Sequence, residues 1–303
     1  MDITPIKYTF SGHESFQCRS LWLKKGFDFV SENGSFNQED AVVELGVGKN
    51  MVAAIRFWMK AFNIISIKDE LTDFGRLLLD DNGWDPYLED DASLWLLHYQ
   101  LVKNNFASTY NIIFNEFRRE KVEFTRDAYV AYIRKRAEFD VNMNFTQNTI
   151  EADFEVFKKM YLTKIDDQKT TEEGFSGLLC DLKLVKVYKK ENSEWNGQKE
   201  AVTKYDCFYI ENSDRPELPA LLFLYAIADN LAFGNSISLA SLENDIDSPG
   251  SIFSLNRTGV LEKVIELKET RKEIGYYDQA GIKELQFVQK PEPFNVLKQY
   301  YEG

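Results

Sequence analysis

One order of local signals occurs twice in the chain, and it restricts the fold more than any other feature of the sequence. In both places the pattern predicts a helix, a short second helix, a tight turn, a third helix and a small hairpin. The two copies share this order without visible sequence identity. Because this order is typical of a winged helix-turn-helix, we expect an α+β, mostly α fold with tandem units of this kind joined by a helical middle region.

The first copy lies in a predicted N-terminal domain at residues 1–82. Ser15 is expected to cap its first helix, and Asn37 its short second helix. Apolar residues at helical spacing predict the third helix at 49–65. A small hairpin is then expected at 64–72, which would complete the first winged unit.

The second copy lies in a predicted C-terminal domain at residues 216–303. Prolines up to Pro219 open its first helix, and Ser238 is expected to cap the second. Ser254 is expected to cap the third helix, which has apolar residues at helical spacing. The hairpin is predicted at 274–288, so this region reads as a second winged-helix-like domain.

The middle region, residues 83–215, is predicted to be mostly helical with a β-hairpin at its C-terminal end. Its expected elements are helices at 90–103, at 105–117, from Thr125 to Phe139 and from Thr146 or Asn148 to Leu162, and strands at 183–190 and 203–211. A polar loop is expected at 166–174, and an Asn196-Gly197 signal predicts the hairpin turn.

The charge balance limits what the chain can bind. It has 36 Lys and Arg residues against 49 Asp and Glu residues, which gives a net charge of −13. So acidic a surface repels nucleic acid, and any DNA contact therefore requires a local basic surface. The hydrophobic content of 44% is enough for a core and excludes a disordered chain.

Cysteine usage and hydropathy indicate the compartment. The three cysteines, Cys18, Cys180 and Cys207, are odd in number and lack the short paired spacing of a zinc site. This pattern excludes a disulfide scaffold and is typical of a reducing compartment. The first ten residues do not resemble a signal peptide, and no apolar run is long enough to span a bilayer. We therefore expect a cytoplasmic protein without membrane contact.

The first candidate for DNA contact is one face of the predicted third helix. This face would carry Lys49, Asn50, Arg56 and Lys60. In a major groove Asn reads adenine, Arg reads guanine and Lys contacts phosphates, so the set suits DNA recognition. The alternative is a solvated helix surface in a domain that contacts protein, and the net charge of −2 over residues 36–80 favours that alternative.

The second candidate is the segment 116–136, which has a net charge of +3 within an acidic chain. A basic stretch interleaved with tyrosines is typical of a surface that follows a phosphate backbone. The residues that would contact DNA are Arg118, Arg119, Arg134, Lys135 and Arg136. The alternative is an ordinary pair of charged helices with local ion pairs.

An acidic cluster at residues 80–91 is the candidate metal site. Asp85, Glu89 and Asp90 would hold Mg²⁺ or Mn²⁺, because carboxylates bind these ions in phosphodiester cleavage. The alternative is that acidic residues ahead of a helix cap it and interact favourably with its dipole. No other cofactor is expected, since the glycines at 46–48 lack the spacing of a phosphate-binding loop.

Three residues are candidates for acid–base catalysis. His13 and Glu14 lie next to a glycine ahead of the first helix, where a base and an acid could act together. His98 follows the acidic cluster on the next predicted helix and could assist proton transfer. The alternative for a histidine in such a setting is a hydrogen bond inside the core.

Three stretches together resemble one bacterial family. They are FSGHESFQCRSLWLKKGFDF at 10–29, ELGVGKNMVAAIRFWMKAFNII at 44–65, and LTDFGRLLL followed by DPYLEDDASLWLLHYQL within 71–101. Their sequence is similar to that of the family named domain of unknown function 4007. The similarity covers most of the chain and is strongest over about residues 10–120.

The resemblance implies a role in DNA modification. Members of the family are found among bacterial anti-phage genes, beside a cysteine desulfurase, a sulfurtransferase and an ATPase. Together such proteins replace a non-bridging phosphate oxygen of DNA with sulfur. The related component of single-strand phosphorothioation systems is described as a DNA-nicking protein. The resemblance therefore implies a DNA-binding component that acts with these proteins and could itself nick DNA.

Three hypotheses follow. The chain is a DNA-binding component of a phosphorothioation system, a metal-dependent DNA-nicking endonuclease, or a non-catalytic winged-helix adaptor or transcriptional regulator that binds DNA and a partner protein. The first includes the other two as special cases and ranks above them. A homodimer is left open.

Overall fold

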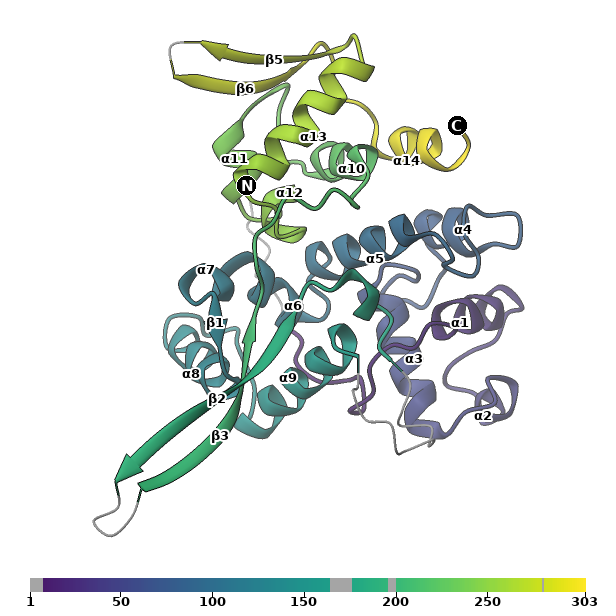
Figure 1. Cartoon of the computed structure of the whole chain (residues 1–303). Coiled ribbons are helices and arrows are strands. Elements are labelled where there is room, and N and C mark those ends of the chain that lie inside the picture. Colours follow the sequence, from purple (N-terminus) through teal and green to yellow (C-terminus); the bar gives the residue numbers. More distant parts are fainter. Residues whose placement is uncertain (1–7, 164–175, 196–199, 280) are drawn as a thin grey trace.

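The fold is α+β (Figure 1), as the sequence predicts. The computed structural model describes residues 8–163, 176–195, 200–279 and 281–303. Helices dominate, and the strands form two antiparallel sheets of three strands each. The loop predicted at 166–174, the Asn196-Gly197 turn and most of the N-terminal stretch lie outside the described residues.

The N-terminal part is a cluster of helices. They are α1 (Trp22–Ser31), α2 (Ala41–Glu44), α3 (Lys49–Ala61) and α4 (Asp73–Leu79). α1 packs against α3 and α4. Where the sequence predicts a hairpin, the chain instead reverses with one isolated antiparallel bridge between Ile65 and Leu71. The reversal is this short because Thr72 already caps α4 by accepting a hydrogen bond from the Gly75 amide.

The middle part surrounds a small sheet with helices. Its helical elements are α5 (Asp91–Lys103), α6 (Ser108–Ile112), the π-helical turn η1 (Ile113–Phe117), α7 (Arg118–Glu120), α8 (Arg126–Ala137), α9 (Gln147–Tyr161) and the 3₁₀ turn η3 (Cys180–Leu182). Its strands are β1 (Glu123–Phe124), β2 (Lys186–Trp195) and β3 (Glu200–Tyr209), with β3 in the centre. The β2–β3 hairpin projects from the helical body (Figure 1).

The C-terminal part lies at the other end of the molecule, at the top of Figure 1. Its elements are α10 (Ala220–Asp229), β4 (Ser236–Ser238), α11 (Leu239–Asn244), α12 (Pro249–Ile252), α13 (Arg257–Thr270), β5 (Ile274–Gln279), β6 (Ile282–Phe287) and α14 (Pro293–Tyr301). β6 lies between β4 and β5. The β5–β6 hairpin occurs where the sequence predicts it, and α14 packs on α10.

The main cluster of buried side chains runs through all three parts of the chain. Its largest members are aromatic, and Trp58, Trp95, Tyr99, Tyr129 and Tyr161 are each at most 1% exposed. Burying a large apolar side chain contributes about 1.5–3 kcal/mol, so this cluster is the main source of stability. The domain boundaries near residues 82 and 215 stay predictions. Within the parts of the chain that the structure describes, no helix is both long and apolar enough to cross a bilayer.

Local capping signals explain several helix starts. Thr125, Thr146 and Ser238 each accept a hydrogen bond from the amide three residues later, so these predicted caps are confirmed. Ser15 and Ser254 were expected to cap helices, but they have φ values of 64° and 53°. An N-cap needs extended backbone, so neither residue can start a helix there. α1 and α13 begin several residues later, and Asn256 caps α13.

Candidate functional site

The segment ahead of α1 forms a loop with unusual backbone torsion angles. Ser11, Gly12, Glu14 and Ser15 have positive φ values of 72°, 99°, 47° and 64°. For residues with a Cβ atom such angles cost roughly 1–3 kcal/mol each, and they persist only where the surroundings enforce them. This loop, residues 11–15, contains both members of the predicted catalytic pair at its N-terminal site.

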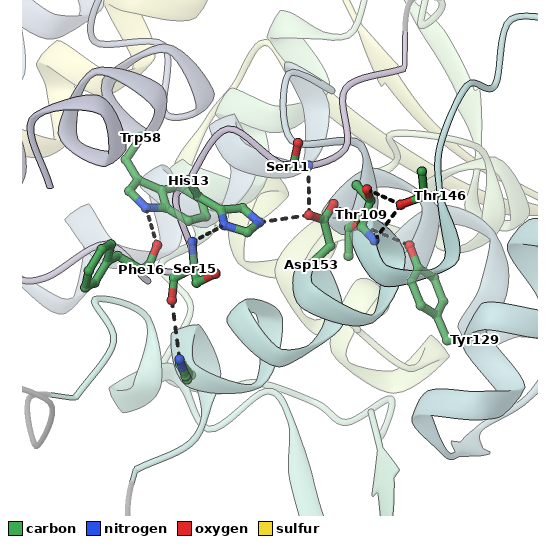
Figure 2. A network of polar contacts seen from close by, with 11 residues as sticks. Ser11, His13, Ser15, Phe16, Trp58, Thr109, Tyr129, Thr146 and Asp153 are labelled. Carbon is green, nitrogen blue, oxygen red and sulfur yellow. Dashed lines mark hydrogen bonds and ion pairs between the residues drawn. The ribbon is translucent and has the colours of Figure 1, made fainter. Parts of the chain in front are cut away.

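A buried carboxylate on α9 enforces the loop (Figure 2). Asp153 is 5% exposed, and its Oδ1 atom accepts hydrogen bonds from the Ser11 amide and from His13 Nε2, both at 2.8 Å. Its Oδ2 atom accepts from the Thr109 hydroxyl at 3.0 Å. That hydroxyl accepts in turn from the Tyr129 hydroxyl at 3.1 Å. Side chains from α6, α8 and α9 therefore hold this one loop.

The hydrogen bonds of His13 fix its protonation state. A backbone amide can only donate, so Nδ1, which the Ser15 amide contacts at 3.2 Å, carries a lone pair. Nε2 then carries the proton and donates it to Asp153. Both nitrogens are engaged within the protein, and His13 is only 4% exposed. His13 therefore organises the loop, which is the alternative that the sequence left open.

Contacts on the other side of the loop complete its support. The His13 ring stacks on the Trp58 indole with 6.0 Å between ring centroids. The Trp58 Nε1 atom donates to the Phe16 carbonyl at 2.9 Å (Figure 2). The predicted partner Glu14 is exposed to solvent. The loop is thus rigid on its inner side and open on its outer side.

An open cleft of about 850 Å³ lies beside this loop. Its walls are α3, the segment 36–42 and Gly12 of the loop. Gly12 has a φ of 99°, and a Cβ atom at this position would lie 2.8 Å from the Phe57 ring. Only glycine lets the loop approach the floor of the cleft in this way. The loop and the cleft therefore form one structural unit.

The cleft carries three of the four residues predicted on the third helix. Lys49, Arg56 and Lys60 line it, and Asn50 is exposed at the start of α3. Asp69 pairs with two of these cations, with 2.5 Å to Arg56 Nη2 and 2.9 Å to Lys60 Nζ. Burial works to raise the pKa of Asp69, but hydrogen bonds from both cations outweigh it and hold the pKa below its usual value. The ionised carboxylate therefore neutralises part of the cationic face.

The predicted basic surface on residues 116–136 is divided by the fold. Arg118 is 7% exposed and donates hydrogen bonds to the carbonyls of Phe114, Gly250 and Ser251 and to the side chain of Asn212. Burial lowers the pKa of this guanidinium to about 10. Arg118 connects the middle and C-terminal parts, so its expected contact with DNA is corrected to a structural role.

The other four basic residues of this surface differ in their availability. Arg119 donates to two acceptors next to α12, and Arg136 pairs with Glu116 at 2.5 Å. Arg134 and Lys135 are exposed near the end of α8. The second candidate surface is thereby reduced mainly to these two residues.

The acidic cluster is organised as a helix start. Asp85 is 8% exposed, and its two carboxylate oxygens accept from the amides of Glu89 and Asp90 at 2.9 and 3.0 Å. Asp90 caps α5 by accepting from the Ala92 amide at 2.8 Å. Among the described residues, no three His, Cys, Asp or Glu side chains are grouped closely enough to hold a metal ion. The three carboxylates therefore do not fit together as a ligand set.

His98 lies inside the core, far from solvent. It is 0% exposed, its Nε2 atom donates to the Ile252 carbonyl at 2.8 Å, and its Nδ1 atom accepts from the Tyr161 hydroxyl at 2.7 Å. Burial lowers the pKa of His98 to about 3. The expectation that His98 assists proton transfer is therefore corrected: it joins α5, α9 and α12 as a neutral hydrogen-bonded core residue.

This environment predicts a specific acid sensitivity. His98 binds a proton near its usual pKa of 6.5 when unfolded, but only near 3 when folded, so its contribution to stability is lost as pH falls from about 6.5 towards 3. We expect this residue alone to lower the free energy of unfolding by roughly 2–3 kcal/mol between pH 7 and pH 4.5. Urea unfolding of the natural chain and of His98→Gln across this range measures the difference in slope. Parallel pH profiles would contradict the assignment.

Two important residues of this site were not among the candidates. Asp153 carries a usable signal, because it lies on the apolar face of its helix between Ile150 and Phe157. A lone carboxylate on such a face is buried and needs donors. Asp69 carries no comparable signal, since it lies in a turn and finds Arg56 only through the fold.

Comparisons with known proteins place the chain in a group. The model of a family described as "Protein of unknown function (DUF4007)" matches residues 10–301. Two solved structures are similar, one described as a magnesium ion-bound SspB crystal structure and the other as an SspB crystal structure. Each is 28% identical with a TM-score of 0.80, and each match covers 97% of this chain and 88% of the other. No curated protein matches the chain.

Proposed function

Since the chain belongs to the DUF4007 family, we propose that it is a DNA-binding component of a bacterial DNA phosphorothioation defence system. The similarity to SspB over 97% of the chain supports involvement in that system. A sulfurtransferase, a cysteine desulfurase and an ATPase are its proposed partners. The three described cysteines are buried and free, which supports the proposed cytoplasmic location.

The observation that carries the proposal is the row of cations on α3. Lys49, Arg56 and Lys60 are spaced by seven and four residues, which puts them on one face of the helix, and all three line the same cleft. Such a local basic face is what an acidic chain needs for contact with phosphates. The exposed pair Arg134 and Lys135 on α8 is the proposed second contact.

We propose that both ends of the chain are winged-helix units. In the C-terminal part, the order of α10, β4, α11, α13 and the β5–β6 hairpin, with β6 central, supports this assignment. In the N-terminal part, α1, α2 and α3 supply the helices, and the bridge between Ile65 and Leu71 is a minimal wing. The C-terminal unit would then be free to contact a partner protein.

The test is DNA binding by variants of the α3 face. The double variant Lys49→Gln/Arg56→Gln is expected to bind a duplex at least 10-fold more weakly at low salt, with a slope of log affinity against log salt reduced by about 2, because each phosphate contact contributes about 0.9. Lys268→Gln/Lys298→Gln removes the same charge from exposed positions on α13 and α14 and is the matched control. Fluorescence anisotropy gives both quantities. Equal affinities for the two double variants would remove α3 from the proposal.

Asp69 allows a test in the opposite direction. It competes with phosphate for Arg56 and Lys60, so Asp69→Asn is expected to strengthen duplex binding several-fold. A gain of affinity is informative, because a damaged fold does not produce it. Weaker binding by this variant would argue that the pairing with Asp69 orients the cations instead of occupying them.

Metal-dependent nicking is the second candidate function. The observation that favours it is the magnesium ion in one of the two similar structures. The described carboxylates of this chain do not form a ligand set, so no residue is assigned to an ion and no step is routed through one. Conversion of supercoiled plasmid to open circles with Mg²⁺ or Mn²⁺, and not with EDTA, would support nicking. Binding without conversion would favour the adaptor or regulator alternative.

A further inference from the structure

We infer that the cleft beside α3 takes one unstacked nucleotide of a DNA strand, an inference that rests on the proposed DNA contact of α3. The site is concave, and its volume of about 850 Å³ is in the range of pockets that enclose small molecules. A concave site receives a group that protrudes from the DNA, and an unstacked nucleotide is such a group.

The lining of the cleft has the two chemical surfaces of a nucleotide. Phe57 and Phe106 lie 5.3 Å apart between ring centroids at its floor, and Phe36 belongs to another wall. Aromatic rings are the usual platform for an unstacked base. The cations Lys49 and Arg56 lie on the same lining and suit the attached phosphate.

The polar atoms of the facing wall favour a base over a simple anion. Asn37 and Gln38 line this wall, and their side-chain carbonyl oxygens accept from Arg56 Nη1 and from the Ser35 amide. Their NH₂ groups are therefore the part of each amide that a ligand would meet. Amide donors beside an aromatic floor suit the polar edge of a base, whereas a free phosphate would use only the cations.

The cations also differ in how available they are for this ligand. Arg56 and Lys60 are paired with Asp69, whereas Lys49 makes no ion pair within the described parts of the chain. A phosphate would therefore meet Lys49 first and would draw Arg56 from Asp69 as it settles. The strained loop at residues 11–15 closes the far end of the cleft through Gly12.

The experiment compares a fully paired duplex with the same duplex carrying a gap of four unpaired nucleotides. The paired DNA must be unstacked before a nucleotide can enter, so the natural chain is expected to bind the gapped DNA roughly tenfold more tightly or better at equal salt. Ala53→Leu adds bulk to an exposed position of α3 that lines the cleft and leaves every charge in place. It is expected to abolish the preference while binding paired DNA as before.

The control is Ala131→Leu, the same change at an exposed position of α8. It is expected to keep the preference. If the natural chain binds both DNAs equally, or if Ala53→Leu keeps the preference, the cleft does not take a nucleotide, although the proposed DNA contact survives. If neither DNA is bound, the proposed function fails together with the inference.

Discussion

Replacing Asp153 with alanine is expected to lower the free energy of unfolding by about 3–5 kcal/mol and to release the loop at residues 11–15. The substitution leaves three donors without their acceptor: the Ser11 amide, His13 Nε2 and the Thr109 hydroxyl. A buried donor without a partner costs about 1–3 kcal/mol. Urea unfolding measures the loss of stability, and amide hydrogen exchange measures the release of the loop.

Glu155→Ala is the matched control for this prediction. It removes a carboxylate from the same helix, α9, at a half-exposed position where the side chain pairs with Lys158. Surface pairs of this kind contribute about 0–1 kcal/mol. Should Asp153→Ala be no less stable than Glu155→Ala, with the Ser11 amide still protected from exchange, other contacts must hold the loop.

The second large effect is expected at Arg118. Arg118→Met keeps the bulk of the side chain but leaves the carbonyls of Gly250 and Ser251 and the side chain of Asn212 without their donor. We expect a loss of about 2–4 kcal/mol, since removal of one member of a buried charged network is strongly destabilising. Faster proteolysis between the middle and C-terminal parts, together with a lower urea midpoint, would show the loss of this connection.

Arg126→Met supplies the comparison. Its guanidinium lies at the surface and pairs with Asp127 and Glu155 at 3.4 and 4.0 Å. A change of less than about 0.5 kcal/mol is expected there. If both arginine variants have the same stability and the same proteolysis rate, Arg118 does not connect the two parts.

Features that depend on neighbouring residues were predictable from the sequence. Thr125, Thr146 and Ser238 cap helices because an N-cap requires only a short polar side chain and the next few amides. Ser15 and Ser254 carry the same local signal but fail as caps, because tertiary contacts put their backbones in the left-handed region. The order of elements could be predicted for the same reason that individual caps could fail.

The site was harder to predict because its contacts cross long stretches of chain. His98 is held by Tyr161 and by Ile252, which lie 63 and 154 residues further along the sequence. No local pattern distinguishes such a core histidine from a catalytic one. For Arg118 the local pattern was misleading, since a run of basic residues suggests a surface while the fold buries one member of the run. The cationic row on α3 was predictable, because it depends only on helical spacing.

The π-helical turn η1 has a consequence for insertions and deletions in this chain. A π turn holds one residue more than an α-helical turn in the same helix. Deleting a single residue from Ile113–Phe117 would restore an α-helix and rotate everything that follows by about 100°. Arg118, the next residue, would then turn away from Gly250 and Ser251 although no side chain had been altered. The docking of the C-terminal part thus depends on the number of residues in one helix as well as on their identity.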